Sequence, residues 1–238
     1  LWSMIPVIGF GIWLGIKAAL NHNRPVDQSL RVFAILGWSF PTFVFALLLL
    51  LVFYARLDWF QPGRLSTAFS QEVLKPGFTT YTHMMTIDAL LNLRFDIFID
   101  AVRHLVMPVV TLSVISIALL LKVTRSAMLE EMRQDYVTTA RSKGLPEKMV
   151  VNRHIRRNAL IPVITVAGLT LAGLLNGVVI TETVFDYPGI GSWAAAAAVS
   201  LDVLSMLGYA MFTAVLIIFA NLITDIMYAV LDPRVRLG

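Results

Sequence analysis

The residues best suited to specific chemistry lie in a polar stretch, residues 136–162, that interrupts an otherwise apolar chain. Its centre holds Thr138, Thr139, Ala140 and Gly144, and basic side chains surround these small residues. Small residues at a bend allow another protein surface to come close, and Lys and Arg can donate hydrogen bonds to its acidic or carbonyl groups. The stretch therefore predicts docking to a partner and no bond-making chemistry.

Motifs of enzymatic chemistry are missing from the sequence. A phosphate-binding loop would need the pattern GxxxxGK[ST], which does not occur. The four histidines are scattered over three segments without an HExxH motif, which argues against a metal site. The apolar segments contain no paired carboxylates and no Gly-x-Ser-x-Gly motif, which argues against an intramembrane protease. We expect a chain that is not an enzyme by itself and that holds no metal or cofactor.

Composition indicates that these residues are carried by membrane-spanning helices. Hydrophobic residues make up 58% of the chain and charged residues 14%, against about 25% charged residues in soluble domains. A helix needs about 20 apolar residues to cross a hydrocarbon core of roughly 30 Å. The segments are apolar all round, unlike the amphipathic helices of soluble proteins. The sequence predicts an all-α, polytopic bundle with five spans, at residues 1–20, 33–55, 105–121, 159–181 and 203–224.

The distribution of Lys and Arg predicts the orientation of these spans. The connections on one side carry fourteen basic residues, and those on the other side carry five. Because cytoplasmic connections are enriched in Lys and Arg, the first side is expected to be cytoplasmic. Leu1 then lies outside and the C-terminus inside. Residues 122–158 become a cytoplasmic loop, and residues 56–104 become an extracytoplasmic connection. Part of the positive charge of the loop serves only to fix this topology.

The cytoplasmic loop is predicted to form two helices and a bend. Residues 130–142 lack Gly and Pro and are expected to continue the preceding helix out of the membrane. Gly144 supplies a positive φ at the helix end, and Pro146 suits the start of the next helix. Residues 147–158 can form that second helix. Its apolar side would hold Met149, Val150 and Ile155, and its basic side Arg153, Arg156 and Arg157.

The loop resembles that of a known family. The stretch TTARSKG is similar to the EAA loop of ABC importer permeases, with Thr138 and Thr139 in place of the usual Glu-Ala. The sequence from DYV to the RHIRRNALIP run resembles the dipeptide and oligopeptide branch of these permeases. Three further stretches agree in the same order along the chain: DAVRHLVMPVVTLS, ETVFDYPGIGSW and LDPRVR.

This resemblance implies a function. Residues 1–238 would be a single transmembrane permease domain, and its loop 122–158 would carry a coupling helix that sits in a cleft of a cytoplasmic ATPase. The coupling residues would be Thr138, Thr139, Ala140, Arg141, Lys143 and Gly144. The resemblance also implies six spans in the full subunit, so we expect sequence and one span upstream of Leu1. The substrate would be a peptide, a nickel complex or an oligosaccharide.

The resemblance further implies partners and a location. A second homologous permease subunit would complete the translocation path, two cytoplasmic ATPase subunits would bind ATP and Mg²⁺, and an extracytoplasmic protein would deliver the substrate. Membrane lipid would surround the chain in the inner membrane of a prokaryote, with the C-terminus in the cytoplasm, and no nucleic acid would be involved.

Two other classes of function compete with this interpretation. A stand-alone secondary transporter or channel would need intramembrane ionisable residues or discontinuous helices for ion coupling, and the sequence nearly lacks such residues. A structural scaffold would leave the docking loop without a purpose.

Polar residues of the fourth predicted span offer a translocation path. Thr170 and Asn176 could line it. The alternative is close helix packing, because Gly168, Ala172 and Asn176 repeat every four positions and Gly173 and Gly177 flank the amide. We favour packing slightly and leave both open.

Two segments outside the predicted spans are also expected to form helices. The connection 56–104 is long and balanced in charge, and it is expected to form small helices that receive the substrate-binding protein. The stretch FDYPGIGSWAAAAAVSLD is too short to span a membrane. It is expected to form a turn and then an alanine-rich helix that is re-entrant or lies on the surface at the mouth of the path.

Overall fold

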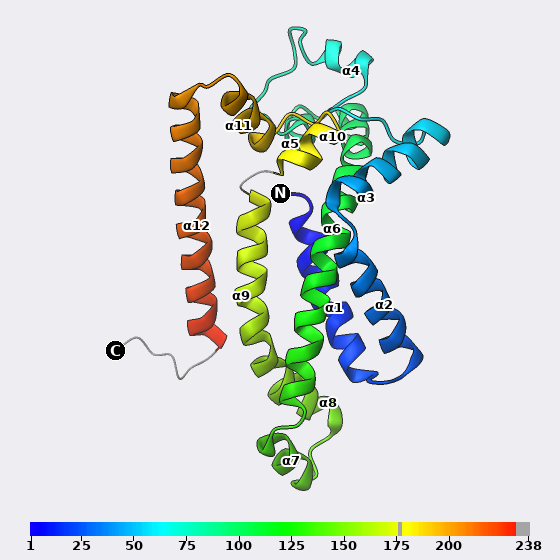
Figure 1. The fold of residues 1–238 in the computed structure, drawn as a ribbon, viewed down its shortest axis with the longest axis vertical. Helices are drawn as coiled ribbons and strands as arrows, with labels where there is room; N and C mark the ends of the chain where they lie inside the picture. Colours follow the sequence, from blue (N-terminus) through cyan, green and yellow to red (C-terminus); the bar gives the residue numbers. More distant parts are fainter. Residues whose placement is uncertain (176–177, 232–238) are drawn as a thin grey trace. The chain divides into compact units, whose positions relative to one another are not determined.

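The protein is described by a computed structural model that covers residues 1–175 and 178–231. Within these ranges the secondary structure is helical and no strand occurs, which confirms the predicted all-α class. The chain divides into two compact units. Unit 1 comprises residues 1–40, 113–176 and 207–238, and unit 2 comprises residues 41–112 and 177–206. Figure 1 gives the course of the helices through both.

Unit 1 contains the predicted docking loop and the helices that carry it. Its core joins side chains of α1, α6, α7, η2 and α9, with Val7, Leu120, Met128, Val150 and Val163 among the buried residues. The helices that lie wholly or partly in this unit are α1 (Met4–Leu20), α2 (Pro25–Ser39), the C-terminal part of α6 (Phe95–Glu131), α7 (Asp135–Ser142), α8 (Glu147–Met149), the π-helix η2 (Val150–Ile155), α9 (Arg156–Leu175) and most of α12 (Val203–Leu231).

Two glycines set the packing of α1 against α6. A Cβ atom on Gly11 would lie 2.8 Å from the Leu120 side chain, and one on Gly15 would lie 2.5 Å from Cβ of Thr124. Neither position has room for a side chain, so the helices can approach this closely only with glycine there. Small residues serve this purpose at helix interfaces in membranes.

Unit 2 consists mainly of shorter helices. They are α3 (Thr42–Leu49), the π-helix η1 (Leu50–Arg56), α4 (Thr67–Glu72), α5 (Met85–Leu91), the N-terminal part of α6, α10 (Val179–Val184) and α11 (Ile190–Val199). Ala46, Met107 and Phe185 form its buried apolar cluster. The expected small helices in the connection 56–104 are thus present as α4 and α5.

The number of helices that could span a membrane is smaller than predicted. By length and composition, three helices in the described part of the chain are long and apolar enough, or up to four if α2 and α3–η1 are one bent span. The continuous helix predicted for residues 33–55 is wrong, because the chain is extended at Phe40 (φ −77°, ψ 125°). Pro41 follows, and a proline disfavours the helical conformation of the residue before it. The first predicted span, α1, has 17 helical residues, at the lower limit for crossing.

Helix boundaries in the docking loop also differ from the prediction. The helix expected over residues 130–142 is divided, since α6 ends at Glu131 and α7 begins at Asp135. The second helix does not end at residue 158, because α8, η2 and α9 follow one another without a break from Glu147 to Leu175. The docking loop is therefore carried directly on the N-terminal end of an apolar helix.

Candidate functional site

The bend of the docking loop has the predicted geometry. Gly144 has a φ of +75°, and its N–H donates a hydrogen bond of 2.9 Å to the carbonyl of Arg141. A Cβ atom at Gly144 would meet nothing within 4 Å. The need for glycine therefore comes from the left-handed backbone, which other residues adopt only at a cost, and not from lack of space.

Helix α7 is packed on one face and open on the other. Val137 and Ala140 are buried in the core that also holds Val150, Val151 and Ile155. This contact fixes α7 against η2. The remaining predicted docking residues are exposed: Thr138, Thr139, Arg141, Lys143 and Gly144.

The apolar side predicted for the second helix is only partly correct. Val150 and Ile155 are fully buried, whereas 40% of Met149 is exposed. Met149 belongs to the single α-helical turn that precedes η2.

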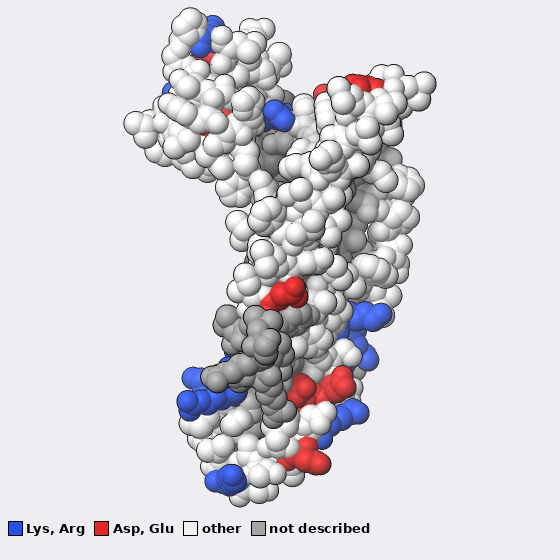
Figure 2. Space-filling view, turned by 90° about the vertical axis from the view of Figure 1, so that its left-hand side faces the viewer, with Lys and Arg blue, Asp and Glu red and all other residues white. Residues whose placement is uncertain are grey.

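An ion pair closes the bend. The Arg141 guanidinium donates to both carboxylate oxygens of Glu147, at 3.1 Å from Nε and 2.7 Å from Nη2. Both side chains are well exposed, so the pair adds only about 0–1 kcal/mol and can exchange for other partners. Figure 2 shows Lys, Arg, Asp and Glu gathered at the end of unit 1 that carries α7 and α8. The bend thus offers charged groups that a partner surface could engage.

Tyr136 ties α7 to the two helices beside it. Its hydroxyl donates to the carboxylate of Glu131 at the end of α6 and accepts a 3.0 Å hydrogen bond from Nδ2 of Asn158 in α9. Partial burial, followed by the hydrogen bond to Glu131, raises the pKa of Tyr136 above its ordinary value. The phenol therefore stays protonated at neutral pH and keeps donating. A displacement of α7 would be passed to both α6 and α9.

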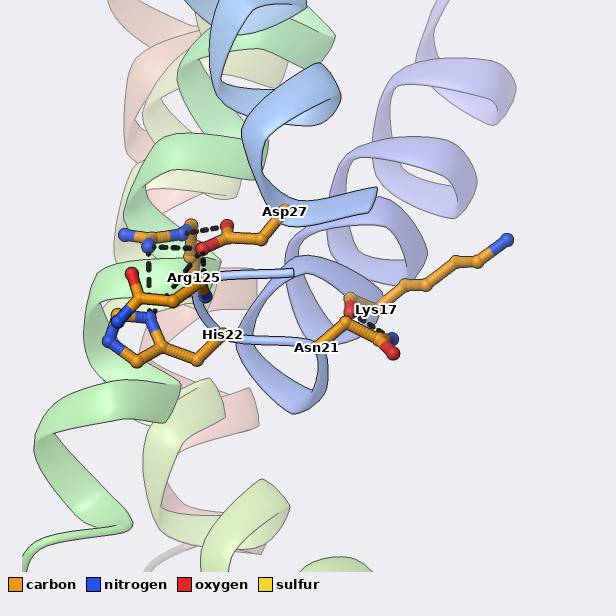
Figure 3. A network of polar contacts seen from close by, with 6 residues as sticks. Lys17, Asn21, His22, Asp27 and Arg125 are labelled. Atoms are coloured by element: carbon orange, nitrogen blue, oxygen red, sulfur yellow. Dashed lines mark hydrogen bonds and ion pairs between the residues drawn. The ribbon is translucent and has the colours of Figure 1, made fainter. Parts of the chain in front are cut away.

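A buried ion pair joins α2 to α6, and the sequence analysis did not predict it. Figure 3 shows Asp27, at the start of α2, facing Arg125 of α6. Arg125 donates to both carboxylate oxygens of Asp27, at 2.6 and 2.8 Å, and the Asp27 side chain is fully buried. Nδ1 of His22 lies 3.2 Å from Arg125 Nη2, and the N–H of Asn23 donates to Asp27. The partners are 98 residues apart, so no spacing rule could have paired them.

The two residues predicted for a translocation path have different outcomes. Thr170 lies half-buried in α9, and its hydroxyl donates a 2.7 Å hydrogen bond to the carbonyl of Val166 in the same helix. Asn176 lies outside the described residues. The packing alternative gains support at Gly168, where a Cβ atom would lie 2.2 Å from Oγ1 of Thr224.

In unit 2, Glu182 organises the turn that precedes α11. Its carboxylate accepts hydrogen bonds from the N–H of Ser192 at 2.6 Å and of Val178 at 3.3 Å. Cβ atoms on Gly189 and Gly191 would lie 2.5 and 3.1 Å from its carboxylate oxygens, so only glycine fits. The negative charge also suits the N-terminus of α11. This arrangement accounts for the motif ETVFDYPGIGSW and confirms the expected turn and alanine-rich helix.

Two segments predicted to lie outside the membrane meet in unit 2. The N–H of Gly63 donates a 2.8 Å hydrogen bond to the carbonyl of Phe185, and the Arg64 guanidinium donates to the carbonyl of Pro188. Arg64 also lies 5.7 Å from the centre of the Tyr187 ring. The connection 56–104 is therefore fastened to the PGIG turn, although the sequence treats them as separate.

Comparison with known proteins assigns this arrangement to a family. The family described as "Binding-protein-dependent transport system inner membrane component" matches residues 10–237. The chain belongs to this family of integral membrane permeases, as the loop motifs predicted. The family is a transport component that works with partner subunits, and its members are multi-pass proteins of the inner membrane.

Individual relatives confirm the predicted branch of the family. A di/tripeptide transport system permease protein of Pseudomonas aeruginosa is 42% identical over 95% of this chain and 66% of its own length. A probable D,D-dipeptide transport system permease protein of Escherichia coli is 39% identical over 99% of the chain and 68% of its own. An oligopeptide transport system permease protein of Bacillus subtilis is 34% identical over 98% of the chain and 66% of its own length. The chain thus spans about two thirds of the length of these relatives.

Proposed function

We propose that this chain is a permease subunit of an ATP-driven ABC importer for dipeptides or oligopeptides. Residues 1–238 act as one transmembrane permease domain that forms part of the translocation path and contains no ATP site. Bound ATP and Mg²⁺ belong to two cytoplasmic ATPase subunits, and substrate arrives from an extracytoplasmic binding protein. A second, homologous permease subunit completes the path. The similarity to peptide permeases supports the substrate class.

The proposed orientation places residues 122–158 and the C-terminus in the cytoplasm and residues 56–104 outside. The imbalance of Lys and Arg between the two sides supports it. In this orientation α7 faces the ATPases. The connection 56–104, with α4 and α5 and its hydrogen bonds to the PGIG turn, faces the binding protein.

The observation that carries the proposal is that α7 is packed on one face and exposed on the other. Val137 and Ala140 anchor the helix to the core, while Thr138, Thr139 and the bend at Gly144 remain exposed. A helix that packs against the core with one face and exposes the other can be displaced by a partner. It can then transmit that displacement to the helices against which it packs. The contacts of Tyr136 supply the route to α6 and α9.

A bulky substitution on the exposed face of α7 tests the docking. Thr139→Trp leaves the core untouched because Thr139 is exposed. It is expected to abolish co-purification of the ATPase subunits and to leave the amount of permease in the membrane unchanged. Gln28→Trp is the matched control, since Gln28 is also exposed and lies on the same proposed side of the membrane, in α2 instead of α7. Normal co-purification by the Thr139 variant would contradict the proposal.

Uptake measurements separate the importer from the stand-alone transporter. Proteoliposomes that contain the complete complex should accumulate a radiolabelled dipeptide only when ATP and the binding protein are both present. Accumulation driven by an ion gradient, without ATP, would favour the secondary transporter instead.

We also propose, as the alternative to the helix packing that Gly168 supports, that Thr170 and Asn176 contribute to the path. The hydroxyl of Thr170 donates within its own helix and keeps an oxygen lone pair that can accept from a passing peptide N–H. Thr170→Val preserves the shape and removes this acceptor, so it should lower uptake while assembly stays normal. Asn176→Leu should do the same if the amide lines the path. Weakened subunit association would show that the two residues serve packing.

A further inference from the structure

An apolar groove lies on the exposed face of α1. Its volume is about 370 Å³, within the about 300–1,000 Å³ of typical small-ligand sites. The lining side chains are all apolar, so the part of a ligand that lies here must be hydrocarbon. The lining residues are Ile5, Pro6, Gly9, Phe10 and Trp13.

Gly9 keeps this groove open, although packing within the described chain does not require a glycine there. Gly11 and Gly15 of the same helix are required by the packing against α6, whereas a Cβ atom on Gly9 would meet nothing within 4 Å. Glycine lowers helix stability relative to alanine. Glycine at this position leaves the groove free of a side chain. The exposed rings of Phe10 and Trp13 form one wall of the groove beside it.

A positive charge lies at one end of the groove. Nζ of Lys17 is 4.9 Å from the centre of the Trp13 ring, and no carboxylate among the described residues lies within ion-pair distance of it. Figure 3 shows the Lys17 side chain pointing away from the Asp27–Arg125 pair. Because Arg125 already neutralises Asp27, this end of the groove keeps its positive charge.

We propose that the groove binds one acyl chain of an anionic phospholipid, whose phosphate pairs with Lys17. The lining residues precede Lys17 by 4 to 12 positions, which is about 6–18 Å along a helix at 1.5 Å per residue. This distance matches one leaflet of a hydrocarbon core of roughly 30 Å. The phosphate of such a lipid supplies a counter-charge that Lys17 does not find among the carboxylates of the described residues.

Photolabelling in nanodiscs tests the site on the complete transport complex. The probe is phosphatidylglycerol with a photoreactive group on its acyl chain, and mass spectrometry maps the labelled peptides. Residues 5–13 should be labelled more strongly than the exposed surface of α12. Gly9→Leu should reduce this labelling severalfold, because the new side chain fills the groove without a clash. Lys17→Gln should reduce it about fivefold, the loss expected for one basic group near an anionic lipid.

Matched variants and a second probe separate the possible outcomes. Gly208→Leu and Arg24→Gln make the same changes at exposed positions outside the groove, and labelling of residues 5–13 should not change. A phosphatidylcholine probe should be insensitive to Lys17→Gln. Uniform labelling of all exposed helices, no labelling of residues 5–13, or indifference to both groove variants would each overturn the proposal. None of these outcomes bears on the transport function.

Discussion

Backbone strain at Gly144 gives the most exacting prediction for the coupling bend. Its φ of +75° is left-handed, a conformation that is about 1–2 kcal/mol less favourable for a residue with a Cβ. A valine is branched at Cβ, which makes that conformation a still rarer outlier. Because every 1.4 kcal/mol is a factor of about ten in an equilibrium constant, Gly144→Val should lower the equilibrium constant for the native bend about tenfold or more. Substrate-stimulated ATP hydrolysis and uptake by the reconstituted complex should fall as that conformation becomes less populated.

A graded series isolates the backbone as the cause. Asparagine tolerates the left-handed region better than other residues with a side chain, so Gly144→Asn should retain most activity, and Gly144→Ala should lie between Asn and Val. All three variants should reach the membrane in normal amounts, since no atom lies within 4 Å of the added Cβ. Equal damage by Asn and Val would refute the reasoning, because side-chain bulk at a docking surface would then be responsible. A fully active Val variant would refute the role of the bend itself.

Three further predictions concern other parts of the chain. Asp27→Asn leaves the mostly buried Arg125 without its counter-charge and should cost about 3 kcal/mol, measured as a lower unfolding temperature in detergent; an unchanged temperature would mean that the pair is dispensable. Single cysteines at Ser142 and Ser200, both exposed, should react with an impermeant reagent from opposite faces of the membrane, and labelling of both from one face would contradict the proposed orientation. Glu182→Ala removes the acceptor for the N–H of Ser192 and should speed amide exchange at the start of α11, whereas unchanged exchange would show that glycine packing alone holds the turn.

Local sequence was enough for features that depend on neighbouring residues. The positive φ of Gly144, the PGIG turn with its alanine-rich helix and the all-helical class follow from glycine conformation and hydropathy. The break at Phe40 was also accessible, because the residue before Pro41 is restricted by a local clash. Hydropathy averages over about 20 residues and hides such a break.

Features that depend on distant residues could not be predicted. The partner of Asp27 is set by the register between α2 and α6, and neither hydropathy nor composition encodes that register. Ala140 was predicted as part of a docking surface because of its neighbours in sequence, yet it is buried against η2. The sequence indicates which stretch is exceptional, and the packing decides which of its side chains face outward.

The Asp27–Arg125 pair also constrains the order of events during synthesis. Arg125 leaves the ribosome 98 residues after Asp27, and at about 5–20 residues per second this is a delay of roughly 5–20 s. Throughout that interval the nascent α2 carries Asp27 without the guanidinium of Arg125. Asp27 lies in the first turn of its helix, two residues after Pro25, where interfacial water can solvate the carboxylate. An acid placed mid-helix, without such water, would have to cross into hydrocarbon alone.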